Sequence, residues 1–289
     1  MKLASYARHG HKGVALVEEG RLIDVTALAP DAPRTMRELL SWLPGQGDRL
    51  SAARDEAVPT IGFDEVEFLP VVEDPHAIWC AALTYMSHVR EGGDRPVPAH
   101  PLFFLRVAAS QVGHRGPLVI PRVSDELDYE GELAVVIGTA GRHIPQSRAL
   151  DHVAGFTCYN DGSVRDWQRH TPQITPGKNF ESTGACGPWL VTRDEFGDPY
   201  RHRMQTRVNG EVVQSAAISE LLFSIEYMVE YLSTICTLQV GDVIVTGTSG
   251  GVGLRRTPPY FLKPGDQVEV EIDGIGTLVN PVRKEEADR

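Results

Sequence analysis

The stretch Glu126–Gly138, ELDYEGELAVVIG, joins an acidic segment to an apolar one. Its second half is aliphatic and β-branched, which predicts a buried strand over Glu130–Ile137. Side chains two residues apart in a strand point to one face, so Asp128, Glu130 and Glu132 are expected to share a side. Neighbouring carboxylates repel one another, and a bound cation removes that cost. The pattern therefore predicts a cation site, with an exposed acidic face as the alternative.

A further acidic ligand is expected from Asp161, which ends the apolar segment GFTCYN at a Gly-Ser turn. Asp166, beside Arg165, is more typical of a structural pair or a helix cap. Ligands that are all oxygen favour Mg²⁺ or Mn²⁺ over zinc. The 4 cysteines are far apart in the sequence and lack the spacing of a zinc or redox motif, so they are expected to be reduced and mostly buried.

Short strands bounded by Gly, Pro and Asp dominate the chain from residue 77 onward. They are expected at Ala77–Leu83, Leu118–Ile120, Glu130–Ile137, Thr206–Val208, Glu211–Val213, Val243–Thr246 and Gln267–Ile272. One long helix is predicted near Ser224–Ile235, where apolar residues recur every three or four positions. Strands without regular helical alternation argue against a doubly wound fold. The predicted class is α+β, predominantly β.

Residues 1–72 are expected to form a small N-terminal α+β domain, and residues 73–289 a larger catalytic domain. KGVALVEEGRLIDVT alternates around Glu-Glu-Gly, which predicts a hairpin. Thr35 and Glu38 have the spacing of a capping box, which predicts a helix over Met36–Leu43.

The composition excludes several classes of protein. The 289 residues carry 28 Lys and Arg against 39 Asp and Glu, a net charge of −11, which argues against a nucleic-acid partner. The apolar runs are shorter than the roughly 18 residues of a membrane span. The start, MKLASYARHG, lacks the apolar segment of a secretory signal, so a cytoplasmic protein with no membrane partner is expected.

Two loops carry further chemistry. The loop at 247–251 matches the G-x-S-x-G nucleophile elbow, but the prolines after it exclude the helix that this motif requires. Its backbone N–H groups would instead suit a substrate carboxylate. His88 and Glu91 are three residues apart, so a helix would place them side by side as a general-base pair. A surface histidine without a role is the alternative.

Together these motifs resemble the fumarylacetoacetate hydrolase family over residues 77–282. The resemblance rests on LDYEGEL at Leu127–Leu133, NDGSVRD at Asn160–Asp166, GKNF at Gly177–Phe180, GPWLVT at Gly187–Thr192, TGTSGGVG at Thr246–Gly253 and GIGTLVNPV at Gly274–Val282. It implies a mixed β-sandwich roll with a small N-terminal domain, and a homodimer.

The resemblance also implies residue roles. It assigns the metal to Glu130, Glu132 and Asp161, and leaves Asp128 out. The implied catalytic residues are His88, Glu91 and Lys178. The implied substrate-binding residues are Tyr85, Arg106, Gln168 and Thr248. The chain departs from the family pattern at Thr84, Ser87, Arg106 and Ser249, which bears on the substrate rather than the metal.

The implied reaction is hydrolysis of a C–C bond in a 2,4-dioxo acid, of the acylpyruvate or fumarylpyruvate kind, in catabolism of aromatic compounds or sugar acids. Mg²⁺ is the expected cofactor, with Mn²⁺ or Ca²⁺ as alternatives. The His88–Glu91 pair would activate water, while the metal and Lys178 would stabilise an enolate leaving group. An isomerase of the 2-hydroxyhepta-2,4-diene-1,7-dioate type and an oxo-acid decarboxylase are alternatives on the same residues. A non-catalytic, metal-stabilised binding protein is the alternative of another class.

Overall fold

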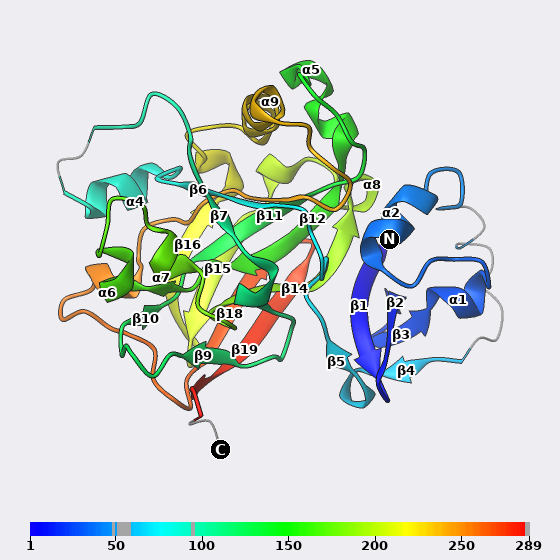
Figure 1. Cartoon of the computed structure of the whole chain (residues 1–289), viewed down its shortest axis with the longest axis horizontal. Helices are drawn as coiled ribbons and strands as arrows, with labels where there is room; N and C mark the ends of the chain where they lie inside the picture. The colour runs from blue at the N-terminus through cyan, green and yellow to red at the C-terminus, as the bar shows by residue number, and fades with distance from the viewer. Residues whose placement is uncertain (48–49, 51–58, 94–95, 287–289) are drawn as a thin grey trace.

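The computed structural model describes residues 1–47, 50, 59–93 and 96–286 (Figure 1). Strands dominate these residues, arranged as a 12-stranded sheet, a 5-stranded sheet and a 2-stranded ribbon. Pairing is mixed, because β17 runs parallel to β6 while most neighbours are antiparallel. The expected α+β, predominantly β class is confirmed.

The large sheet carries most of the strands. Its order is β4 (Ile61–Gly62), β3 (Arg21–Asp24), β2 (His11–Glu18), β1 (Lys2–Arg8), β14 (Gly184–Thr192), β12 (Val153–Asn160), β11 (Gly131–Ile137), β17 (Val243–Val245), β6 (Ile78–Ala82) and β7 (Leu102–Arg106), with β5 (Glu67–Phe68) on β1 and β8 (Gln111–Val112) on β14.

The five-stranded sheet has the order β16 (Glu211–Ala217), β15 (Arg203–Val208), β18 (Gln267–Ile272), β19 (Gly276–Lys284) and β9 (Leu118–Ile120). The ribbon pairs β10 (Leu127–Asp128) with β13 (Ser163–Val164). The described α-helices are α1 (Val25–Leu28), α2 (Met36–Trp42), α4 (Met86–Glu91), α5 (Gln146–Ala149), α6 (Arg165–Gln168), α7 (Thr175–Lys178), α8 (Arg193–Phe196) and α9 (Ile225–Ile235).

The strand β11 is buried on both faces, which explains its unbroken apolar sequence. Leu133 and Val135 contribute to a core that includes Val270 of the five-stranded sheet. Ala134 and Val136, on the opposite face, belong to a second core with Leu39 of α2. This double burial makes β11 the centre of the β-sandwich.

The N-terminal strands continue the large sheet, since β1 pairs with β14 through Leu3 and Leu190 (Figure 1). The expected hairpin is β2 and β3, and α2 begins after Thr35, whose hydroxyl accepts from the Glu38 amide. The division into residues 1–72 and 73–289 stays a prediction.

The seven strands predicted from residue 77 onward are all present, with ends that differ by at most four residues, whereas strands such as β12 and β14 were not predicted. The strand predicted from Glu130 begins at Gly131, so two residues separate β10 from β11. The helix predicted near Ser224–Ile235 is α9, with Ser224 as its N-cap. All four cysteines are free, and only Cys236 is not fully buried. No described helix has the length and apolarity needed to cross a membrane.

Candidate metal and active site

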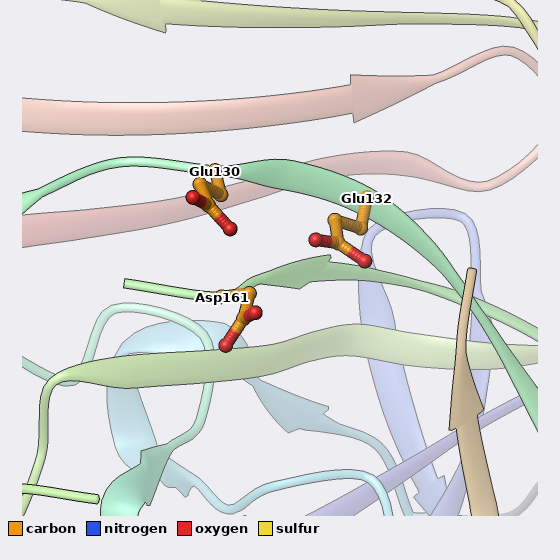
Figure 2. Close-up of side chains that lie close together, drawn as sticks. All are labelled: Glu130, Glu132 and Asp161. Carbon is orange, nitrogen blue, oxygen red and sulfur yellow. The ribbon is translucent and has the colours of Figure 1, made fainter. Parts of the chain in front are cut away.

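Three buried carboxylates meet at one end of β11 and β12 (Figure 2). Glu130 and Glu132 flank the first residue of β11, and Asp161 follows β12 directly. The register of the two strands pairs Gly131 with Asn160, and the Asp161 N–H donates to the Glu130 carbonyl at 2.8 Å. The pairing of β11 with β12 thus brings together residues that are about 30 positions apart in the sequence.

The three side chains offer one oxygen each, and these oxygens lie within 4.8 Å of one another. Figure 2 shows the three side chains close together, with Asp161 below the two glutamates. An all-oxygen, carboxylate donor set suits a hard divalent ion and not a soft one. The residues present therefore fit a divalent metal, as the sequence predicts.

Lys178 lies among the carboxylates, at the end of α7. Its Nζ donates to Glu130 Oε2 at 2.7 Å and to Asp161 Oδ2 at 2.6 Å. Burial alone would lower the pKa of Lys178, but the charges of Asp161 and Glu130 outweigh burial and raise it. The side chain is therefore a permanent cation beside the three carboxylates.

Arg106 forms an ion pair with Asp161, and Arg165 forms one with Glu130. Arg106 Nη1 lies 2.5 Å from Asp161 Oδ1, and Arg165 Nη1 lies 2.7 Å from Glu130 Oε1. Burial would raise the pKa of Glu130, but the charges of Lys178 and Arg165 lower it far below its usual range. Both arginines are buried, so these pairs fix the carboxylates with little screening by water.

Neighbouring groups compensate the negative charge of Glu132 much less than that of Glu130. Its carboxylate accepts a hydrogen bond from the N–H of Gly247, at 2.5 Å. Burial, and then the charges of Asp161 and Glu130, raise the pKa of Glu132 well above its usual range. Gly247 has φ +97°, and a Cβ there would meet Thr84 Oγ1 at 1.9 Å, so only glycine allows this contact.

Asp128 does not belong to the carboxylate cluster, although the Arg165 guanidinium contacts both Asp128 and Glu130. Asp128 ends β10, two residues before β11 begins. Its carboxylate accepts from Arg165 Nε at 2.9 Å and from the N–H groups of Gly253 and Leu254. The resemblance likewise leaves Asp128 out of the set of metal ligands that it implies.

The predicted pair of His88 and Glu91 lies on α4, where Nδ1 of His88 is 2.6 Å from Glu91 Oε1. The other oxygen of Glu91 accepts the N–H of Gly251 at 2.7 Å. Ser87 Oγ likewise accepts the N–H of Gly250. Helix α4 is thus bonded to the glycine-rich loop that follows β17.

A cavity of about 650 Å³ connects these groups. Its lining includes the three carboxylates together with His88, Lys178, Gln168 and Thr248. Tyr85 and Arg106 are buried and do not line it: the Tyr85 hydroxyl has no hydrogen-bond partner among the described residues, and Arg106 contacts Asp161 instead. Glu91 is also outside the lining and reaches the cavity through His88.

Sequence reasoning missed the role of Arg165, which it treated only as a neighbour of Asp166. Asp166 does have the expected structural role, because it accepts from Ser124 Oγ at 2.7 Å and from the Trp167 N–H. Arg165 instead pairs with Asp128 and Glu130, from which it is separated by more than thirty residues. No local pattern indicates such a pair.

The family described as "Fumarylacetoacetate (FAA) hydrolase C-terminal" matches residues 77–283. The human protein "Oxaloacetate tautomerase FAHD2A, mitochondrial" is 41% identical over 278 residues, covering 94% of this chain and 87% of the human one. "Oxaloacetate tautomerase YisK" of Bacillus subtilis (strain 168) is 38% identical over 267 residues, covering 91% and 86% of the two chains. Maleylpyruvate hydrolase from Sphingobium sp. SYK-6, solved with manganese(II) ion and pyruvate, superposes with a TM-score of 0.83 at 27% identity, covering 99% of this chain and 100% of that one. The chain belongs to the fumarylacetoacetate hydrolase family.

Proposed function

We propose that the protein is a divalent-metal-dependent tautomerase that interconverts the keto and enol forms of oxaloacetate or a closely similar 2-oxo acid. The proposal rests on one observation. The same cavity is lined by the buried cluster of Glu130, Glu132 and Asp161 and by His88. The naming of two relatives of nearly full-length similarity as oxaloacetate tautomerases supports the choice of substrate.

Glu130, Glu132 and Asp161 would hold the ion, with Mg²⁺ as the expected metal and Mn²⁺ or Ca²⁺ as alternatives. When bound there, such an ion supplies Lewis-acid polarisation of the substrate's 2-oxo group, which acidifies the hydrogens on C3. The complex of maleylpyruvate hydrolase with manganese(II) supports a divalent ion of this size and hardness.

His88 is the proposed proton carrier. Its Nδ1 is bonded to Glu91, which leaves Nε2 to exchange a proton with C3 of the substrate. In the direction from enol to keto, His88 delivers a proton to C3, the C2=C3 bond becomes single, and the enol hydroxyl proton leaves to solvent. Lys178 keeps a positive charge next to the carboxylates throughout and favours substrate oxygens that carry negative charge.

Hydrolysis of a C–C bond, the first reaction expected from the sequence, stays the second candidate. The likeness to maleylpyruvate hydrolase supports it. In that reaction His88 would remove a proton from water, and the resulting hydroxide would attack the carbonyl carbon of the bond that breaks. The bond between that carbonyl carbon and the pyruvate part would break, and the pyruvate part would leave as its enol. The oxygen from water would end in the new carboxylate.

The experiment follows oxaloacetate, a small acylpyruvate panel and their products. Tautomerisation predicts that the ultraviolet absorbance of enol-oxaloacetate decays faster with protein and Mg²⁺ than with protein and EDTA, and that all the oxaloacetate is recovered. Hydrolysis predicts ¹⁸O from labelled water in a released acid, and decarboxylation predicts released carbon dioxide. A decay rate equal to that of buffer with Mg²⁺ would remove the tautomerase proposal.

Two further expectations from the sequence stay predictions. One is a homodimer, to be tested by light scattering of the purified protein. The other is a cytoplasmic location, and the word mitochondrial in the human relative's name concerns that protein alone. Neither expectation is needed for the chemistry proposed above.

A further inference from the structure

We infer that Arg255 binds the substrate carboxylate that does not lie at the Glu130–Glu132–Asp161 cluster. Arg255 would thereby select dicarboxylic 2-oxo acids over monocarboxylic ones. This inference rests on the proposed function and adds the residue that reads the far end of the substrate. Arg255 ends a 3₁₀ turn, Gly253–Arg255, that lines the same cavity as His88.

The first support is charge. The other cationic groups of the cavity lining already have carboxylate partners in the chain: Lys178 with Glu130 and Asp161, Arg165 with Asp128 and Glu130, and Arg169 with Glu126. Within the described residues, Arg255 is the arginine of this lining that has no carboxylate partner. A ligand carboxylate would provide the planar, charged partner that a guanidinium prefers.

The second support is that the backbone of Arg255 is fixed relative to the carboxylate cluster. Asp128 accepts from the N–H groups of Gly253 and Leu254 at 2.8 and 2.9 Å. The same carboxylate bonds Arg165, whose Nη1 contacts Glu130. Asp128 therefore connects the turn that carries Arg255 to a metal ligand through one shared, buried carboxylate.

The fit of this turn against Asp128 is close. A Cβ on Gly253 would meet Asp128 Oδ1 at 2.6 Å and the Tyr260 carbonyl at 2.0 Å, so no larger residue would fit. The Tyr260 N–H also donates to the Gly253 carbonyl at 2.9 Å. A rigid backbone lowers the entropy cost of positioning the long arginine side chain on a ligand.

The third support is the contrast within the cavity. Leu102, Phe103, Pro172 and Ile174 give part of the lining an apolar character. An apolar substrate tail would find its contacts there, and the Arg255 guanidinium would gain no charged partner from it. A second substrate carboxylate would pair with the Arg255 guanidinium, which has no carboxylate partner in the described part of the chain. The lining therefore favours a dicarboxylic substrate.

The test compares oxaloacetate with its 4-ethyl ester, which keeps the 2-oxo acid end and lacks the second charge. We expect Arg255→Gln to lower kcat/KM for oxaloacetate about tenfold or more, the usual value of one charge-assisted hydrogen bond, and to leave kcat/KM for the ester little changed. Arg255→Lys should restore part of the preference. Arg256→Gln is the matched control, because Arg256 pairs with Glu211 at 2.7 Å and does not line this cavity.

A second readout does not need turnover. With Mn²⁺ present, oxaloacetate should raise the unfolding temperature of the wild type and of Arg256→Gln more than that of Arg255→Gln, while the ester should give equal shifts. The inference would be overturned if Arg255→Gln lowered kcat/KM and the unfolding shift equally for oxaloacetate and for the ester, or lowered them for neither compound. If the wild type converts neither compound, the tautomerase proposal fails, and the unfolding shifts still decide whether Arg255 binds the second carboxylate.

Discussion

The carboxylate of Glu91 accepts from the N–H of Gly251 through one oxygen and lies 2.6 Å from His88 Nδ1 through the other. The orientation of the His88 imidazole is therefore coupled to the loop after β17. That loop also carries Thr248, whose hydroxyl donates to the Gly131 carbonyl at 2.9 Å. His88 and the first residue of β11 are thus connected through the backbone of this loop and the hydrogen bonds at its two ends.

Replacing His88 tests its role as the proton carrier. His88→Ala should lower kcat on the order of 10²- to 10⁴-fold, the usual range for a positioned general base. Mn²⁺ affinity should be unchanged, because His88 is not one of the three clustered carboxylates. Steady-state kinetics and titration calorimetry measure the two effects, with the exposed His11→Ala as control. A rate close to that of the wild type would exclude His88 as the base.

Glu132→Gln separates metal binding from folding. The variant should lose divalent-ion binding, because one of three ligand charges is gone. In EDTA its unfolding temperature should equal or exceed that of the wild type, since the mutation removes repulsion from Asp161 and Glu130. A gain of 1 kcal/mol would correspond to about 2 °C in a chain of this size. Unchanged Mg²⁺ affinity by calorimetry would contradict the assignment of Glu132 as a ligand.

Lys178→Met should have the opposite effect on stability. It leaves Glu130 and Asp161 without the cation that contacts both, a loss of about 3 kcal/mol or more for a broken buried pair. Thermal unfolding in EDTA should show this loss, and Mn²⁺ should reverse part of it by restoring positive charge. In kinetics, kcat should fall more than KM rises if Lys178 acts mainly in the transition state.

The control for that variant is Lys263→Met, since Lys263 Nζ lies over the Tyr260 ring and Lys263 does not line the cavity. An unfolding temperature that is the same in the wild type and in Lys178→Met would mean that the two ion pairs add nothing to stability. A raised KM with kcat intact would assign Lys178 to ground-state binding.

A buried histidine outside the site makes stability depend on pH. Burial, and then the charge of Arg115, lower the pKa of His114 from 6.5 to about 4. Its Nδ1 also accepts the Val279 N–H at 3.1 Å, which protonation would break. Because the unfolded chain binds this proton more readily, stability is fully present above about pH 6.5 and is lost as the pH falls to 4.

The expected loss from His114 alone is about 3 kcal/mol between pH 6.5 and 4. Urea unfolding of the wild type and of His114→Gln at several pH values isolates it, because the variant lacks the titrating group. His11→Gln, at an exposed position, should keep the full pH dependence. Parallel curves for the wild type and His114→Gln would show that His114 does not titrate as stated.

Local chemistry explains why much of the structure could be predicted. Thr35 and Glu38 determine the start of α2 by themselves, and the apolar run of β11 indicates burial on both faces. Strand alternation identifies Glu130 and Glu132, although Glu130 lies just before the strand. The same rule groups Asp128 with them, but Asp128 bonds Arg165 and the turn at Gly253 and is not part of the carboxylate cluster.

The remaining features depend on contacts between distant segments. Arg106 approaches Asp161 only because β6 and β7 join the same sheet as β12. The pairing of Asp128 with the turn at Gly253 joins residues 125 positions apart. Such contacts follow from strand order and register, which composition and periodicity do not specify.

In the proposed mechanism, the carboxylate cluster and His88 together carry out a metal-dependent proton transfer at C3 of a 2-oxo acid. Nuclear magnetic resonance of oxaloacetate in deuterated water measures that transfer directly, as exchange of the C3 hydrogens with solvent. With Mg²⁺ the wild type should speed this exchange well above the rate in buffer, and EDTA, Glu132→Gln and His88→Ala should each bring it back towards that rate. Exchange in the wild type that equals the rate in buffer, or that EDTA leaves unchanged, would contradict the mechanism.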